Sequence, residues 1–93
     1  MYAIVCFDRP ESAALRDAHR AAHTDFLEKN SAKIVYGGPL KGRADGASTG
    51  ALMVVDCATR EEAEAFIAAD PFRQAGVYES VAVRAFKQVF PRK

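Results

Sequence analysis

Tryptophan is absent from this sequence of 93 residues, cysteine occurs only twice, and the charges almost cancel. Cys6 and Cys57 are too few to build the disulfide framework of a small secreted domain, and they lack the spacing of a zinc site. Thirteen Lys and Arg against twelve Asp and Glu give a net charge of +1. That balance lacks the basic excess needed to bind nucleic acid or a membrane surface. We therefore expect neither of these partners, and no metal.

Targeting signals and common catalytic signatures are absent too. No apolar stretch approaches the ~20 residues of a membrane-spanning helix. The N-terminal segment has neither the basic region nor the cleavage site of a signal peptide. The sequence contains no Walker loop and no GxGxxG, HExxH or GxSxG pattern. These absences predict a cytoplasmic protein that works without a bound cofactor.

Apolar periodicity and turn residues predict six elements in a single domain over residues 1–93. Four short apolar or β-branched segments predict strands over residues 2–7, 33–36, 51–57 and 79–90. Two segments with helical spacing predict helices over residues 11–29 and 60–69. The order β-α-β-β-α-β with right-handed crossovers predicts an α+β, ferredoxin-like fold. Its antiparallel sheet should have the order 4-1-3-2, with both helices on one face.

Three local patterns refine this prediction. Residues Thr59 to Glu62 form a capping box that opens the second helix. The sequence Gly37-Gly38-Pro39 is expected to end the second strand and to begin a loop that reaches Gly50. The first helix should turn one apolar stripe toward the sheet, formed by Leu15, Ala18, Ala22 and Phe26.

The first and third predicted strands are apolar at nearly every position, over residues 3–7 and 51–55. A strand with one solvated face alternates apolar and polar residues instead. The two helices cover one face of the sheet, and no further segment is left to cover the other. We therefore expect a homodimer that packs sheet on sheet, in the common twofold arrangement.

Both histidines, His19 and His23, lie four residues apart on the first predicted helix and are neighbours on one face. His23 stands beside Phe26 at the border of the apolar stripe, where an imidazole suits acid–base chemistry near neutral pH. For His19 we prefer a surface position. Two histidines do not make a metal site, and Arg20 between them would repel a cation.

Asp70 and Arg20 are further candidates. Asp70 is predicted at the end of a helix, where the helix dipole disfavours a carboxylate. Such a violation of a local rule often marks a function, although a cap on the following turn explains Asp70 equally well. Arg20 is the best-placed cation for an anionic substrate, whereas most exposed helical arginines are simply solvated.

Segments spread over nearly the whole chain resemble the YciI-like (YCII-related) proteins. They are Arg20 to His23, Gly38-Pro39, Thr49-Gly50, Asp70 to Glu79 and Ala85 to Phe90. The resemblance implies a ferredoxin-like fold, a dimeric α+β barrel-type assembly and an active site centred on a histidine and an aspartate. One related protein removes chloride from a chlorinated hydroxyhydroquinone, and the fold is also similar to that of muconolactone isomerases.

Carried over by position, the resemblance assigns the catalytic pair to His23 and Asp70. The substrate-binding residues it implies, with the adjacent Phe72 included, are Arg20, Gly38, Pro39, Thr49 and Phe72. The chain departs from the family pattern at Ala51, where relatives often have serine. The two predicted helices run in opposite directions. The pair therefore meets only if residues 71–76 fold back toward the sheet, or if a partner chain supplies one member.

Two functions are consistent with these observations. The first is a small cofactor-free enzyme in which His23 moves a proton and Asp70 orients the imidazole. It would be a lyase, dehydrochlorinase or isomerase, or less specifically a hydrolase, that acts on a small cyclic or anionic substrate. The alternative is a non-catalytic dimeric module that binds a ligand or assists a larger enzyme.

Overall fold

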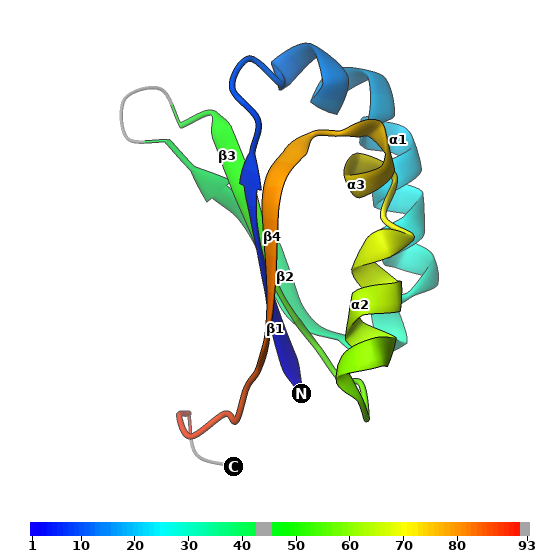
Figure 1. The fold of residues 1–93 in the computed structure, drawn as a ribbon, viewed down its shortest axis with the longest axis vertical. Coiled ribbons are helices and arrows are strands. Elements are labelled where there is room, and N and C mark those ends of the chain that lie inside the picture. The colour runs from blue at the N-terminus through cyan, green and yellow to red at the C-terminus, as the bar shows by residue number, and fades with distance from the viewer. Residues whose placement is uncertain (43–45, 92–93) are drawn as a thin grey trace.

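A computed structural model of the chain describes residues 1–42 and 46–91. Four strands form one antiparallel sheet in the order β2-β3-β1-β4, and Figure 1 shows all the helices on one side of it. The predicted α+β class, topology and sheet order are therefore confirmed. The elements are β1 (Tyr2–Asp8), α1 (Ala13–Lys29), η1 (Ser31–Lys33), β2 (Ile34–Lys41), β3 (Ser48–Val55), α2 (Arg60–Ala68), α3 (Pro71–Ala75) and β4 (Tyr78–Ala85).

The boundaries of β2, β3 and β4 differ from the prediction, and β3 covers Ser48–Val55 instead of residues 51–57. β2 does not stop at Tyr36 but continues through Gly37-Gly38-Pro39 to Lys41. A proline is tolerated there because β2 is an edge strand, where a missing N–H removes no bond to a neighbour on the open side. The connection to β3 is therefore shorter than predicted, and its residues 43–45 lie outside the described part of the chain. β4 ends at Ala85 rather than Phe90, because Ala85 already pairs with Tyr2 at the start of β1.

α2 forms the well-packed part of the helical layer. Thr59 caps α2 as predicted, since Glu62 N donates to Thr59 Oγ1 at 3.2 Å. The return bond is shifted by one residue, because the Glu62 carboxylate accepts from Ala58 N at 3.1 Å rather than from Thr59 N. Ala63, Phe66 and Ile67 are buried against the sheet. The core that they join includes Ile4, Met53, Val55, Val77 and Val83. This half of the molecule stabilises the fold by burying apolar surface.

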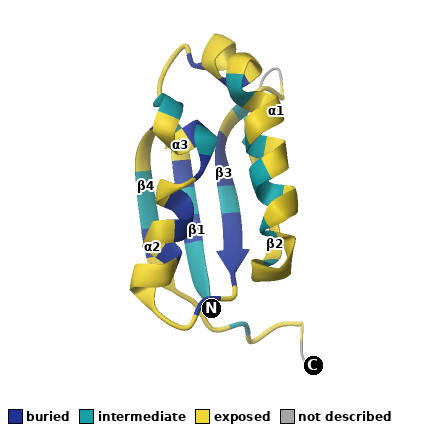
Figure 2. Cartoon of the chain, turned by 90° about the vertical axis from the view of Figure 1, so that its right-hand side faces the viewer, coloured by how far each residue is buried: buried dark blue, intermediate teal, exposed yellow. Residues whose placement is uncertain are grey.

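α1 does not bury the predicted stripe. Leu15 is 37% exposed and Ala18 and Ala22 are exposed, whereas Arg16 is the buried residue of the helix. The residues turned inward are Arg16, His19, His23, Phe26 and Leu27, of which the last four are half-buried. α1 packs mainly against α3, and the part of its inner face near Arg16 and His23 is polar. The difference in colour between α1 and α2 is visible in Figure 2.

Cys6 and Cys57 are both free thiols and both buried, as predicted. Burial, with the nearby charge of Asp70, raises the pKa of Cys6 to about 12. Burial also raises the pKa of Cys57. Both side chains therefore act as small apolar residues of the core rather than as nucleophiles. No helix in the described residues is long and apolar enough to cross a membrane.

Candidate functional site

Asp70 stands at the junction of two helices. It follows the C-terminal cap of α2 at Ala69 and is itself the N-terminal cap of α3, where Oδ1 accepts from Phe72 N at 3.0 Å. The carboxylate is therefore favourably placed at a helix N-terminus, which corrects the expected conflict with the helix dipole. Asp70 is also fully buried, at 0% exposure. A cap alone does not require a buried carboxylate, so its other contacts are informative.

His23 and Asp70 meet within one chain. His23 Nδ1 lies 2.7 Å from Asp70 Oδ1, because α3 folds back against α1. The His23 ring stacks on Phe72, with ring centres 3.9 Å apart and planes 9° from parallel. Tyr78 adds a third donor, its hydroxyl lying 3.4 Å from Asp70 Oδ2. The carboxylate and the stacked ring together fix the position and the orientation of the imidazole.

This arrangement selects one tautomer of the neutral imidazole. Because Asp70 Oδ1 already accepts the Phe72 N–H, it is an acceptor, and His23 Nδ1 must donate to it. Nε2 is then the unprotonated nitrogen. It has no hydrogen-bond partner among the described residues, and the half-buried ring borders a cavity. A nitrogen so placed can accept a proton from a bound molecule.

The cavity lies between α1, α3 and the strands β2 and β3, and its volume is about 380 Å³. Leu27, Ile34, Ala51 and Met53 form much of its apolar wall. Its charged lining residues, as far as the structure describes the chain, are the cations Arg16, Arg20 and Lys41, and no Asp or Glu lines it. A small, mostly apolar compound with a negative charge suits this lining.

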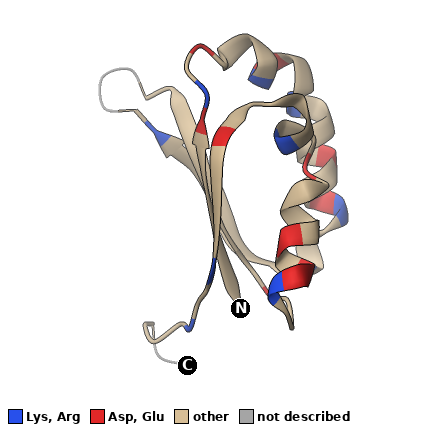
Figure 3. Cartoon of the chain, in the orientation of Figure 1, with Lys and Arg blue, Asp and Glu red and all other residues tan. Residues whose placement is uncertain are grey.

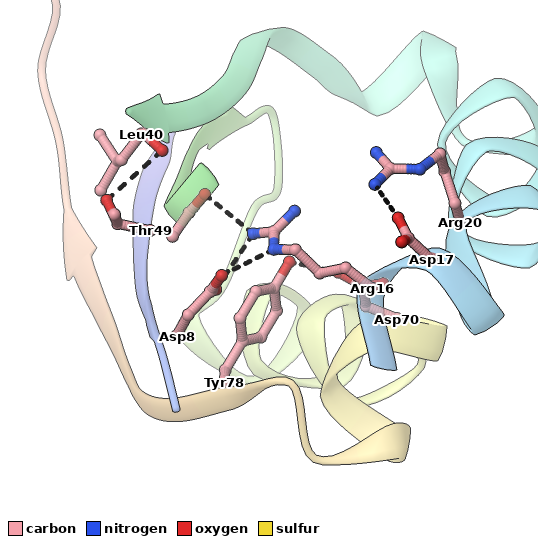
Figure 4. Close-up of polar contacts among 9 residues, drawn as sticks. Asp8, Arg16, Asp17, Arg20, Leu40, Thr49, Asp70 and Tyr78 are labelled. Carbon is pink, nitrogen blue, oxygen red and sulfur yellow. Dashed lines mark hydrogen bonds and ion pairs between the residues drawn. The ribbon is translucent and has the colours of Figure 1, made fainter. Parts of the chain in front are cut away.

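The predicted substrate-binding residues fall into two groups. Arg20, Gly38, Pro39 and Phe72 all line the cavity. The Arg20 guanidinium, however, pairs with Asp17 at 2.9 Å on the exposed side of α1, as Figure 4 shows. Thr49 differs from the expectation: it lines an adjoining groove, its hydroxyl donates to Leu40 O at 3.4 Å, and its neighbour Ser48 faces the cavity instead.

Arg16 and Tyr78 are lining residues that the sequence analysis missed. Arg16 is 6% exposed and binds the Asp8 carboxylate with two nitrogens, at 2.6 and 3.0 Å. Although burial opposes it, the hydrogen bond and charge of Asp8 raise the pKa of Arg16. Burial, with the nearby charge of Asp70, raises the pKa of Tyr78, so its hydroxyl stays a neutral donor. The available signal for Arg16 was its position seven residues before His23, two turns away on the same helix face.

No three His, Cys, Asp or Glu side chains come together in residues 1–42 and 46–91 in a way that could hold a metal ion. The structure does bring together three side-chain groups that can take part in acid–base chemistry. These are a fixed imidazole with a free nitrogen, a buried carboxylate behind it and a guanidinium nearby.

Comparisons with known proteins agree with this architecture. The family model for the YCII-related domain matches residues 1–87. The proteins called YciI from Escherichia coli O6:H1 and from Shigella flexneri are each 33% identical over 97 residues, covering 97% of this chain and 99% of the relative. A solved structure of similar fold is 5-chloro-2-hydroxyhydroquinone dehydrochlorinase (TftG) from Burkholderia phenoliruptrix AC1100, in complex with 2,5-dihydroxybenzoquinone. It has a TM-score of 0.86 and 33% identity, and the match covers 92% of each chain.

Proposed function

The chain belongs to the YCII-related domain family, and from that premise and the site geometry we propose that it is a small acid–base enzyme. In this proposal His23 moves a proton and Asp70 holds the imidazole and stabilises its charged form. The substrate is a small oxygenated ring compound, and the reaction is an elimination of HCl or a related isomerisation. Neither reaction changes the oxidation state of the substrate overall, so the chemistry does not call for a redox cofactor.

The observation that carries the proposal is the contact of 2.7 Å between His23 Nδ1 and Asp70 Oδ1, with Nε2 left open to a cavity. A histidine whose only role was packing would not need a fully buried carboxylate behind it and a free nitrogen in front. The similar protein TftG is a dehydrochlorinase, and its solved structure is a complex with 2,5-dihydroxybenzoquinone. A ring of that size fits a cavity of about 380 Å³.

The proposed step needs one base and one leaving group. His23 Nε2 takes a proton from a ring hydroxyl, or from a carbon next to a carbonyl. The chlorinated ring reacts as its keto tautomer, in which the proton of one hydroxyl has moved to the carbon that bears the chlorine. When His23 takes the proton of the hydroxyl para to that new carbonyl, the O–H electron pair forms a second C=O bond. The ring π pair then moves to the chlorine-bearing carbon, and the C–Cl bond breaks with its pair to release chloride. His23 then passes the proton to water. Asp70 compensates the positive charge that the imidazole carries in between.

Chloride release from 5-chloro-2-hydroxyhydroquinone tests the proposal. We expect the wild type to accelerate it and His23→Gln to reduce kcat by about 100-fold or more, the usual loss on removing a general base. His19→Gln is the matched control on the same helix and should keep the rate. A wild type that does no better than buffer, with this substrate and a panel of haloaromatic and lactone compounds, overturns the enzyme proposal. If that protein still binds the ring, the ligand-binding module becomes the function.

We also propose that the chain forms a homodimer, as predicted from the first and third strands, which are apolar on both faces of the sheet. The face of the sheet away from the helices carries Phe7, which is 53% exposed, and Tyr36, which is 50% exposed. The strands in Figure 3 are largely uncharged, whereas α1 and α2 carry several charged residues of both signs. Light scattering should give about 20 kDa, twice the chain mass of 10.1 kDa, and Phe7→Asp should give the monomer. A wild-type monomer at micromolar concentration would contradict this assembly.

A further inference from the structure

The guanidinium of Arg16 is held in one orientation by three bonds. Nε and Nη2 bind the two oxygens of Asp8, and Nη2 also donates to Gly50 O at 3.1 Å. Asp8 is itself 6% exposed, so the fork is shielded from water. Gly50 is needed at this position, because a Cβ there would lie 2.1 Å from Cys6 O. A cation fixed in this way has already lost its rotamer freedom before any ligand arrives.

The remaining nitrogen of Arg16, Nη1, is free. No described residue accepts a hydrogen bond from it, and no buried side-chain nitrogen or oxygen of a described residue lacks a partner. Nη1 is therefore the part of this almost buried side chain that reaches open space. Arg16 lines both the cavity and the adjoining groove, and Figure 4 shows the unbonded nitrogen pointing away from Asp8.

Arg16 and His23 act on the same small volume. Both side chains lie close to the Phe72 ring. The guanidinium carbon of Arg16 is 4.9 Å from the centre of that ring, and the centre of the His23 ring is 3.9 Å from the same point. One small ring compound can therefore contact both. The other cations of the lining are less well held than Arg16, since Arg20 is 58% exposed at its side chain and pairs with Asp17, and Lys41 is exposed.

We propose that Nη1 of Arg16 is an oxyanion subsite, which binds a negatively charged oxygen of a planar ring ligand whose other end faces His23. The inference rests on the proposed function, and it names the ligand class as an anionic ring compound with an enolate, phenolate or carboxylate oxygen. A charge-assisted hydrogen bond from a preformed guanidinium stabilises such an oxygen and any negative charge that grows on it when a proton leaves the ring. Asp8 and Gly50 then act as positioning groups for Arg16.

The competing explanation is that Arg16 only ties α1 to β1 and β3. Two quinones distinguish these explanations: 2,5-dihydroxybenzoquinone, an anion at neutral pH, and 2,5-dimethoxybenzoquinone, its neutral and slightly larger dimethyl ether. Titration calorimetry on the folded dimer or monomer gives both affinities. For Arg16→Gln and Arg16→Lys we expect the anion to bind about 10-fold or more weakly, the usual loss of a charged hydrogen bond, with the neutral probe changed about twofold at most. Lys29→Gln, which removes an exposed cation from the same helix, should change neither.

Asp8→Asn provides a second test, since it removes the countercharge and keeps two acceptors for the Arg16 guanidinium, the Asn oxygen and Gly50 O. An oxyanion subsite predicts tighter binding of the anion to this variant, by about threefold or more, because Arg16 is no longer neutralised. A purely structural Arg16 predicts that Asp8→Asn and the Arg16 variants weaken both probes alike. That result overturns the inference, and so does a wild type that binds neither probe at millimolar concentration. The His23→Gln variant should still bind the anionic probe more tightly than the neutral probe. The anion subsite can therefore be confirmed even if the protein does not release chloride. Conversely, a chloride release that depends on His23 can be observed even if Arg16 does not bind the anion.

Discussion

α1 and α2 cover the same face of one sheet, but they bury different kinds of surface. α2 buries Ala63, Phe66 and Ile67, each no more than 6% exposed, against β1 and β4. α1 buries Arg16 and half-buries His23, and it leaves a cavity of about 380 Å³ between itself and the strands β2 and β3. The α2 half of the helical layer is packed densely, which stabilises the fold. The α1 half is packed less densely, and its polar groups border a cavity.

The difference explains how so small a domain can hold a site. A chain of 93 residues has only a few kcal/mol of net stability to lose. Ala63, Phe66 and Ile67 of the dense half join the apolar core, while the polar groups of the other half are paired with each other: Arg16 with Asp8, and His23 with Asp70. Each pair joins α1 to a different element, β1 or the start of α3. The site therefore also helps to hold α1 in place.

The largest expected effect is on the α2 side. Phe66→Ala should lower the free energy of unfolding by about 3–5 kcal/mol, because it opens a cavity in the packed core beside Phe26. Leu15→Ala, on the outer side of α1, should change it by no more than about 0.5 kcal/mol. Urea denaturation of the two variants measures both values. Equal losses would contradict the observed orientation of α1.

The next largest effect is expected when a buried alanine in each half of the molecule is replaced by valine. Ala63→Val should cost about 1–3 kcal/mol, because Ala63 is fully buried in a packed layer. Ala51→Val should change stability by less than about 1 kcal/mol, because Ala51 lines the cavity. It should instead weaken the binding of 2,5-dihydroxybenzoquinone, as calorimetry can show. A costly Ala51→Val that leaves binding unchanged would mean that the cavity is closed in solution.

The N-terminal caps of α2 and α3, Thr59 and Asp70, allow a further comparison between a structural residue and a residue of the site. Thr59→Ala removes the cap of α2 and should cost about 1 kcal/mol without affecting chloride release. Asp70→Asn keeps a capping oxygen for α3 and should cost a similar amount, but it removes the charge behind His23. Chloride release should then fall by about 100-fold or more. If both variants lose activity equally, Asp70 acts only as a cap.

The smallest effect concerns alkaline pH. Burial keeps Cys6 and Tyr78 protonated in the folded protein at pH values where the unfolded chain releases these protons. Their stabilising contribution is complete below pH 9, the ordinary pKa of cysteine, and is lost as the pH rises toward the pKa of about 12 of folded Cys6. Tyr78→Phe should reduce this loss by a few tenths of a kcal/mol near pH 10. Exposed Tyr36→Phe should not, and equal slopes for both variants in urea titrations would contradict the buried hydroxyl.

The sequence predicts the dense half better than the polar half. The helix cap at Thr59 and the apolar spacing from Ala63 to Ile67 are local signals, and both are confirmed. The face of α1 was assigned wrongly because its Leu and Ala residues suggested the sheet side. A polar face turned inward can be recognised only once its partners, such as Asp8 for Arg16, are known.

The candidate site was predicted in part. The residues His23 and Asp70 were named from position, but the fold-back of α3 that joins them is a tertiary feature without a local signal beyond Pro71. Arg16 was missed because a helical arginine is usually exposed. Tyr78 was placed in the family motif but given no role, since its burial against Asp70 depends on the same fold-back.

The tautomer of His23 tests the central claim most directly. Nitrogen NMR of the imidazole side chains, recorded where both histidines are neutral, reports which ring nitrogen carries the proton. The account predicts a protonated Nδ1 and an unprotonated Nε2 for His23, because Nδ1 donates to Asp70. In Asp70→Ala, which removes the accepting oxygen, this preference should disappear, and His19 should be the same in both proteins. A proton on Nε2 of wild-type His23, or a tautomer that does not respond to Asp70→Ala, would contradict the proposed base.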